Sequence, residues 1–130
     1  MAKAVGVGGV FFKARDAKAL SQWYEEHLGI GGRVSGEALT FEGPESMGMT
    51  VFSQFPAETQ YFGDGPQQFM VNFRVDDLNG LLDRLAAAGA RIDPKREDTP
   101  YGPFAWIWDP EGNRVELWEP KTPEDEPTEK

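Results

Sequence analysis

The sequence has no cysteine and only one histidine among its 130 residues. Without cysteine the chain can form no disulfide, hold no metal through a thiolate and use no cysteine nucleophile, which is typical of a cytosolic protein. No apolar run approaches the roughly 20 residues of a membrane-spanning helix, and the N-terminus MAKAVGVGGVFF lacks the segment order of a signal peptide. We therefore expect a cytoplasmic protein without a membrane partner.

Basic residues are also scarce, because 13 Lys and Arg stand against 22 Asp and Glu, for a net charge of −9. An acidic body repels phosphate backbones, and no basic stripe with interleaved aromatics occurs, so we expect no nucleic-acid partner. The last ten residues, KTPEDEPTEK, combine proline with charge and predict a disordered acidic tail over 121–130. The remaining chain is of a size typical of one compact domain, 1–120.

One pattern occurs twice, at an offset of 61 residues. GVFFKARDAKALSQWYEEHLG at 9–29 returns as MVNFRVDDLNGLLDRLAAAGA at 70–90. The identical pairs are Val10 and Val71, Phe12 and Phe73, Asp16 and Asp77, and Leu20 and Leu81. The repeat predicts two copies of a strand–helix unit, and two such halves can enclose a cleft.

The first half, about 5–55, begins with a strand over 5–14. Asp16 is placed to cap a helix that Gly29 ends. Strands are predicted over 37–43 and 48–55, joined through the turn-rich GPES, with a weak short strand near 32–35. The apolar helix positions expected to share one stripe are Leu20, Trp23, Tyr24 and Leu28.

The second half, about 68–120, follows a proline- and glycine-rich linker over 56–67. A strand over 69–75 precedes a helix that Asp77 caps and Gly89 ends. Strands over 104–108 and 114–120 flank the turn DPEGN. The apolar helix positions are Leu78, Leu81, Leu82 and Leu85.

Alternate residues of a strand point to opposite faces of its sheet, which separates two rows. The apolar row, expected under the helices, comprises Val10, Phe12, Ala14, Val71, Phe73, Val75, Val115 and Leu117. The opposite, mixed row comprises Gly9, Phe11, Lys13, Met70, Asn72, Arg74, Glu116 and Trp118. Parity does not tell whether Trp106 and Trp108 join this second row.

Three segments carry a family resemblance: WYEEHLGI, FRVDDLNGLLDRLAAAGARI and YGPFAWIWDPEGNRVELWEP. With them the chain resembles the vicinal oxygen chelate superfamily, which contains glyoxalase I, bleomycin-resistance proteins, extradiol dioxygenases and fosfomycin-resistance enzymes. The resemblance covers 5–120. It implies an α+β fold of paired βαβββ modules, whose mixed, curved sheet surrounds a cavity, and it implies a homodimer.

In metal-dependent members of that superfamily, a histidine starts the first strand of each module and a glutamate stands on the last. The matching positions here are Gly9, Met70 and Glu116. A glycine and a thioether do not replace two imidazoles on a divalent transition metal. The sole histidine, His27, falls at a helix end, where the helix dipole favours it on the solvent side. We therefore expect no metal and no other cofactor.

The predicted inner row instead offers a carboxylate among aromatic and polar side chains. Aromatic planes beside a carboxylate suit a flat or cationic organic molecule. The residues expected to contact such a ligand are Phe11, Met70, Asn72, Arg74, Tyr101, Trp106 and Trp118, with Glu116 as the one candidate catalytic group. The main prediction is metal-independent binding of a small organic molecule, as in bleomycin-type resistance proteins.

Two other functions stay open. The chain could be a lyase or isomerase of the lactoylglutathione lyase or dioxygenase type, with Glu116 as the base that moves a proton beside a carbonyl. Arg74, helped by Asn72, would then have to stabilise the enolate. If Glu116 simply pairs with Arg74, it is a poor base. A purely structural role as a scaffold for a partner is the third reading.

Overall fold

The structure is a computed structural model that describes residues 1–30, 32–41 and 50–121. In each half of the chain a strand and a helix are followed by three more strands, so the chain consists of two βαβββ modules. This confirms the predicted α+β fold class. The chain divides into two compact units, an N-terminal unit of Val7–Val71 and a C-terminal unit of Met1–Gly6 with Asn72–Lys130. None of the described helices is long and apolar enough to cross a membrane.

The N-terminal unit contains most of β1 (Ala4–Ala14), then α1 (Ala17–Leu28), β2 (Gly32–Ser35), β3 (Ala38–Thr40) and β4 (Val51–Pro56). Its strands lie in the order β2-β3-β4-β1. The β1 and β4 strands are parallel, whereas β3 is antiparallel to both β4 and β2. The predicted turn GPES and the adjoining ends of the two predicted strands lie outside the described residues.

The α1 helix has the predicted ends. The Asp16 carboxylate accepts a hydrogen bond from the Ala19 backbone N–H at 3.1 Å, and Gly29 adopts a left-handed φ of 69°. The predicted stripe is only partly correct, because Trp23 is 49% and Leu28 62% exposed. The sheet side of α1 is instead formed by Ala17 and Ser21, which are buried, with Leu20 and Tyr24 half-buried.

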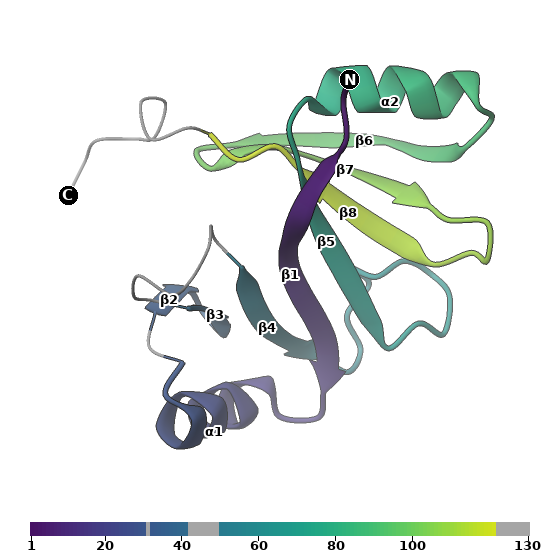
Figure 1. Cartoon of the computed structure of the whole chain (residues 1–130). Helices are drawn as coiled ribbons and strands as arrows, with labels where there is room; N and C mark the ends of the chain where they lie inside the picture. Colours follow the sequence, from purple (N-terminus) through teal and green to yellow (C-terminus); the bar gives the residue numbers. More distant parts are fainter. Residues whose placement is uncertain (31, 42–49, 122–130) are drawn as a thin grey trace. The chain divides into compact units, whose positions relative to one another are not determined.

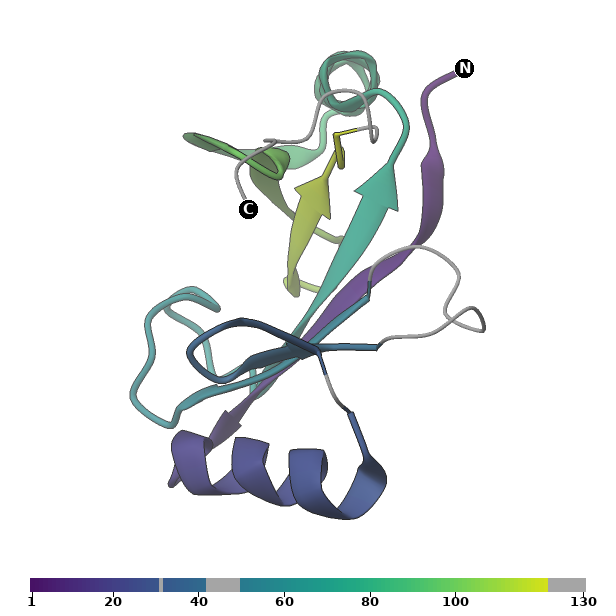
Figure 2. The ribbon, with the colours of Figure 1, turned by 90° about the vertical axis from the view of Figure 1, so that its left-hand side faces the viewer.

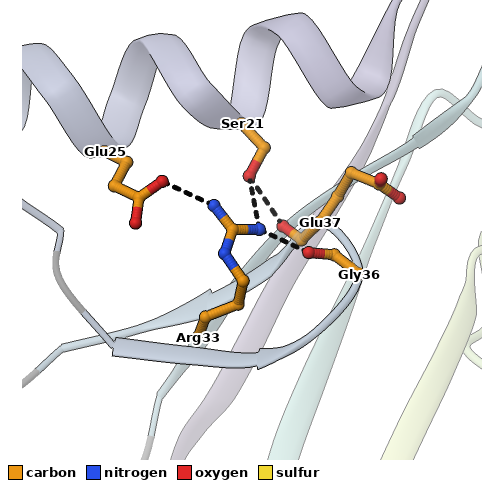
Figure 3. A network of polar contacts seen from close by, with 5 residues as sticks. All are labelled: Ser21, Glu25, Arg33, Gly36 and Glu37. Atoms are coloured by element: carbon orange, nitrogen blue, oxygen red, sulfur yellow. Dashed lines mark hydrogen bonds and ion pairs between the residues drawn. The ribbon is translucent and has the colours of Figure 1, made fainter.

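A polar cluster ties α1 to the β2–β3 hairpin (Figure 3). The Arg33 guanidinium on β2 donates to the Glu25 carboxylate at 2.6 Å and to the Gly36 carbonyl. It also lies 3.5 Å from the Ser21 hydroxyl, which donates in turn to the Glu37 carbonyl at 3.1 Å. Because Ser21 is 1% exposed, this cluster replaces water at a buried hydroxyl. Figure 2 shows α1 running beside the strands of its unit.

The C-terminal unit contains most of β5 (Phe69–Val75), then α2 (Leu78–Ala87), β6 (Arg91–Thr99), β7 (Gly102–Trp108) and β8 (Arg114–Trp118). Its strand order, β5-β8-β7-β6, repeats that of the first module. The β5 and β8 strands are parallel, and β7 is antiparallel to β8 and β6. The Asp77 carboxylate caps α2 by accepting from the Gly80 N–H at 3.0 Å, and Gly89 is left-handed at φ 82°, as predicted.

The α2 helix covers one face of this sheet (Figure 1). The buried core between them comprises Val75, Leu78, Leu81, Ala105 and Leu117, with Phe73, Leu82, Leu85, Ile107 and Val115 packed at its edge. The predicted apolar rows of β5, β8 and α2 therefore meet here. Strand alternation then leaves the opposite face to Asn72, Arg74, Glu116 and Trp118, together with the residues that pair with them.

Two further features of this unit bear on the prediction. The turn DPEGN forms as expected: the Asp109 carboxylate accepts from the Glu111 and Asn113 backbone N–H groups, each at 2.9 Å. The hydrogen bond from the Asn113 side-chain amide, followed by these backbone bonds, holds the pKa of Asp109 below its usual value. The β6 strand, by contrast, was not predicted from its residues. The acidic tail at 122–130 lies outside the described residues.

Candidate ligand-binding face

The candidate site is the face of the C-terminal sheet that points away from α2. Three strands bring one residue each to its centre. Glu116 on β8 pairs with Asn72 on β5 and with Trp106 on β7. Their side chains lie in one row across the sheet, because paired residues of neighbouring strands point to the same face. The exposed fractions are 1% for Glu116, 1% for Asn72 and 0% for Trp106.

Hydrogen bonds fix the Glu116 carboxylate from both sides. The Asn72 amide donates from Nδ2 to Oε1 at 2.6 Å, and the Trp106 indole donates from Nε1 to Oε2 at 2.9 Å. These two hydrogen bonds hold a buried carboxyl group in a fixed orientation. Because a buried acceptor without partners is costly, the two donors make burial of this glutamate possible.

A second row, one pleat away, contains two stacked aromatic rings, and Trp118 in it is 4% exposed. Trp118 pairs with Arg74 on one side and with Phe104 on the other. The rings of Phe104 and Trp118 stack with centroids 5.6 Å apart and planes 5° from parallel. The Trp118 indole donates to the Tyr101 carbonyl at 2.8 Å, which fixes the ring. The Arg74 guanidinium lies against Gly6, at a position where any larger side chain would collide with it.

Cationic side chains surround the two tryptophans of β7, Trp106 and Trp108. The Arg114 guanidinium lies 5.3 Å from the Trp106 ring centre and 5.2 Å from that of Trp108. Arg91 lies 3.8 Å above Trp108, and Lys95 lies 5.3 Å from Trp106. These distances are those of cation–π contacts. Both tryptophans therefore belong to the Glu116 face, which parity alone left open.

One acidic group balances part of this charge. The Arg114 guanidinium donates to the Asp93 carboxylate at 2.8 Å, with side chains 9% and 19% exposed. This hydrogen bond, with a second from the Lys95 backbone N–H, holds the pKa of Asp93 below its usual value. Sequence analysis missed Phe104, Asp93 and Arg114 as contributors to this face. Only the register between β6, β7 and β8 reveals them.

The other predicted ligand contacts are Tyr101, Phe11 and Met70. Tyr101 is 50% exposed and contributes its backbone carbonyl rather than its ring. Phe11 and Met70 belong to the N-terminal unit, where both are buried. Phe11 packs against Phe55 there, with ring centres 5.4 Å apart. Lys13, in the same unit, is half-buried with its amine 5.8 Å from the Phe62 ring centre.

The residues at the family's metal positions do not fit a transition-metal ion. At Gly9 a Cβ atom would lie 2.8 Å from the Phe11 ring, so that ring fills the space beside the strand. Met70 offers only a thioether, and both Glu116 oxygens accept hydrogen bonds from other side chains. Among the described residues, no group of three or more His, Cys, Asp or Glu could hold a metal ion. His27 is exposed at the end of α1.

Comparison with solved structures shows which proteins share this fold. Methylmalonyl-CoA epimerase from Mycobacterium tuberculosis matches with a TM-score of 0.63 and 19% identity, over 92% of this chain and 90% of that one. The Streptomyces coelicolor methylmalonyl-CoA epimerase in complex with 2-nitronate-propionyl-CoA matches with a TM-score of 0.67 and 12% identity, over 92% and 100%. A Legionella pneumophila protein described as an NAD-dependent benzaldehyde dehydrogenase matches with a TM-score of 0.59 and 13% identity, over 87% and 98%. At these identities the likeness concerns the fold alone.

A comparison with curated proteins gave no match. The sequence does match a family model. The model of the glyoxalase-like domain matches residues 9–118, which includes the repeat, both helices and the Glu116 row. The chain therefore belongs to the glyoxalase-like domain family.

Proposed function

We propose that this protein binds a small organic molecule against the Glu116 face without using a metal ion. The observation that carries the proposal is the state of the carboxylate, which is buried and has both oxygens engaged by neutral donors. Such a group is oriented to attract and align a polar or cationic ligand. The stacked Phe104 and Trp118 rings supply an apolar plane beside it.

The alternative is proton transfer by Glu116, as in an isomerase or lyase. It has support from several fold neighbours that are methylmalonyl-CoA epimerases, one of them in complex with 2-nitronate-propionyl-CoA. A general base must reach the proton that it removes, within hydrogen-bond distance. Both oxygens of Glu116 already accept side-chain hydrogen bonds, which makes this carboxyl group a poor proton acceptor, so binding is favoured over catalysis.

Tryptophan fluorescence tests the binding proposal. Trp23 is 49% exposed on α1, so a Trp23→Phe background leaves only the three tryptophans of the C-terminal sheet. Indole, benzamidine and methylmalonyl-CoA are suitable probes of flat, cationic and thioester chemistry. We expect benzamidine to quench the fluorescence with saturation, and Glu116→Gln to weaken this binding by about tenfold, since it removes the charge that attracts the cation. Saturable binding that survives Glu116→Gln unchanged would contradict the assigned role of the carboxylate.

Deuterium exchange tests the alternative. Incubation of methylmalonyl-CoA with the protein in heavy water reports removal of the proton beside the thioester carbonyl. The binding proposal expects no protein-dependent exchange. Exchange that Glu116→Gln abolishes while thioester binding persists would establish catalysis instead. Metal analysis of protein purified without chelators completes the test, since one transition-metal ion bound per chain would contradict the metal-free assignment.

The proposed assembly is a homodimer in the cytoplasm. Exposed apolar side chains such as Val5, Val7 and Phe69 give an association surface a physical basis. Sedimentation velocity across a range of protein concentrations tests the dimer.

A further inference from the structure

One polar atom of the candidate face has no partner. Asn72 Oδ1 is fully buried and has no hydrogen-bond partner within the part of the chain that the structure describes. Buried polar atoms in folded proteins are nearly always hydrogen-bonded, because an unpaired one carries its whole desolvation cost. None of the described residues supplies the missing donor, so a bound molecule can supply it.

The chemistry of Glu116 determines which end of the Asn72 amide is left over. In its ionised form Glu116 only accepts hydrogen bonds, so the amide then turns Nδ2 toward Glu116 Oε1, where it donates at 2.6 Å. Glu116 is in turn held by the Trp106 indole at Oε2. Trp106 and Asn72 therefore both donate to Glu116, which accepts one hydrogen bond at each oxygen. The Asn72 atom that is left over is its Oδ1.

We propose that the ligand of this face carries an N–H or O–H donor that binds Asn72 Oδ1. This inference rests on the proposed binding function and adds a substrate class to it. The neighbouring row offers the parallel rings of Phe104 and Trp118, with Trp118 fixed by its bond to the Tyr101 carbonyl. The ligand class is therefore a flat, apolar ring system with a donor at its edge.

Pairs of probes that differ only in the donor test this inference. Indole and 1-methylindole are titrated into the isotope-labelled full chain, and the amide and indole resonances of Asn72 and Trp106 are followed by NMR. The expected result is tighter binding of indole by about tenfold, which corresponds to one hydrogen bond of about 1.4 kcal/mol. Asn72→Leu should remove the preference, and Asn79→Leu, an exposed position on α2, should keep it.

Glu116→Gln provides a second, isosteric variant that should fold like the wild type. Its amide would keep an oxygen toward the Trp106 indole and turn its nitrogen toward Asn72. The Asn72 amide must then rotate and present its Nδ2 hydrogens to the ligand. The preference for indole should disappear, and a preference for the ring acceptor of quinoline over naphthalene should appear.

The outcomes separate the two proposals. Equal affinity of indole and 1-methylindole for the wild-type chain would overturn the donor inference and leave the binding function in place. A preference that survives Asn72→Leu, or that Glu116→Gln does not reverse, would overturn it as well. If no probe shifts the Trp106 and Asn72 resonances at millimolar concentration, both the inference and the proposed function are wrong.

Discussion

Trp106 and Glu116 stand opposite each other on β7 and β8, and the indole Nε1 donates to the carboxylate Oε2 at 2.9 Å. Neither side chain has appreciable contact with solvent, at 0% and 1% exposure. Lys95 and Arg114 lie on the Trp106 ring, and such cations make the indole N–H a better donor. The Trp106 N–H that orients Glu116 is thus itself polarised by the charges of Lys95 and Arg114.

Trp106→Phe should lower the free energy of unfolding by about 1–3 kcal/mol, because the buried carboxylate loses a donor while the ring is largely kept. Urea unfolding measures the change. Trp108→Phe is the matched control, since Trp108 stacks with Arg91 and Arg114. Equal losses of unfolding free energy in the two variants would show that the hydrogen bond from Trp106 to Glu116 adds nothing to stability.

Local chemistry explains which parts of the fold could be predicted from the sequence. Asp16 and Asp77 cap their helices, and Gly29 and Gly89 adopt the left-handed conformation after them. The period-2 alternation of β5 and β8 separated the α2 face from the Glu116 face correctly. In both cases the signal lies within a few neighbouring residues.

Contacts between strands could not be predicted from such local signals. The run FAWIW in β7 is apolar throughout, so alternation could not assign Trp106 to a face; its pairing with Glu116 does. The β6 strand, RIDPKREDT, has charges and a proline typical of a loop, yet it forms as the outermost strand of its sheet. Edge strands tolerate proline and favour charge, which hides them from pattern analysis. Trp23 was misplaced, since the buried side of α1 is formed by Ala17 and Ser21.

Gln54→Met should stabilise the protein by about 1–2 kcal/mol. Gln54 on β4 is 2% exposed, and neither of its side-chain amide atoms has a hydrogen-bond partner in the described part of the chain. Methionine has a similar shape without the desolvation cost. Urea unfolding tests this, with Gln22→Met at an exposed position of α1 as control. A loss of stability would mean that a buried water satisfies the amide.

Asp93→Asn should destabilise the protein by about 1–3 kcal/mol near neutral pH, since Arg114 loses its ionised partner. The hydrogen bond from Arg114 is the main cause that lowers the folded pKa of Asp93 below its usual value. Its stabilisation is therefore fully present above that value and is lost as pH falls through the folded pKa. The stability difference between wild type and variant should shrink steadily in acid. Glu97→Gln, at an exposed pair with Lys95, should show little change at any pH.

Arg33→Lys should loosen the β2–β3 hairpin while leaving the C-terminal unit unchanged. The guanidinium reaches Glu25, Ser21 and Gly36 at once, and an ammonium cannot reproduce this planar, multiple contact. Hydrogen exchange with mass spectrometry should show faster exchange over 32–40. Lys18→Arg, at an exposed position of α1, is the control. Unchanged protection would mean that backbone pairing with β4 is sufficient to hold the hairpin.

Gly102→Ala should be among the most damaging single changes in the chain, with a loss of about 2–5 kcal/mol from backbone strain and overpacking together. Gly102 begins β7 with φ of 116°, and a Cβ atom there would collide with the Glu119 carbonyl. That backbone cannot move aside easily, because the Glu119 N–H donates to the Pro103 carbonyl at 3.2 Å. Gly89→Ala is the matched control: its φ is 82°, but nothing lies within 4 Å of the added atom. Thermal unfolding should therefore show a loss of only about 1–2 kcal/mol for Gly89→Ala. Similar losses for both glycines would show that the positive φ alone causes the effect. The close approach of Gly102 to the Glu119 carbonyl would then add no cost.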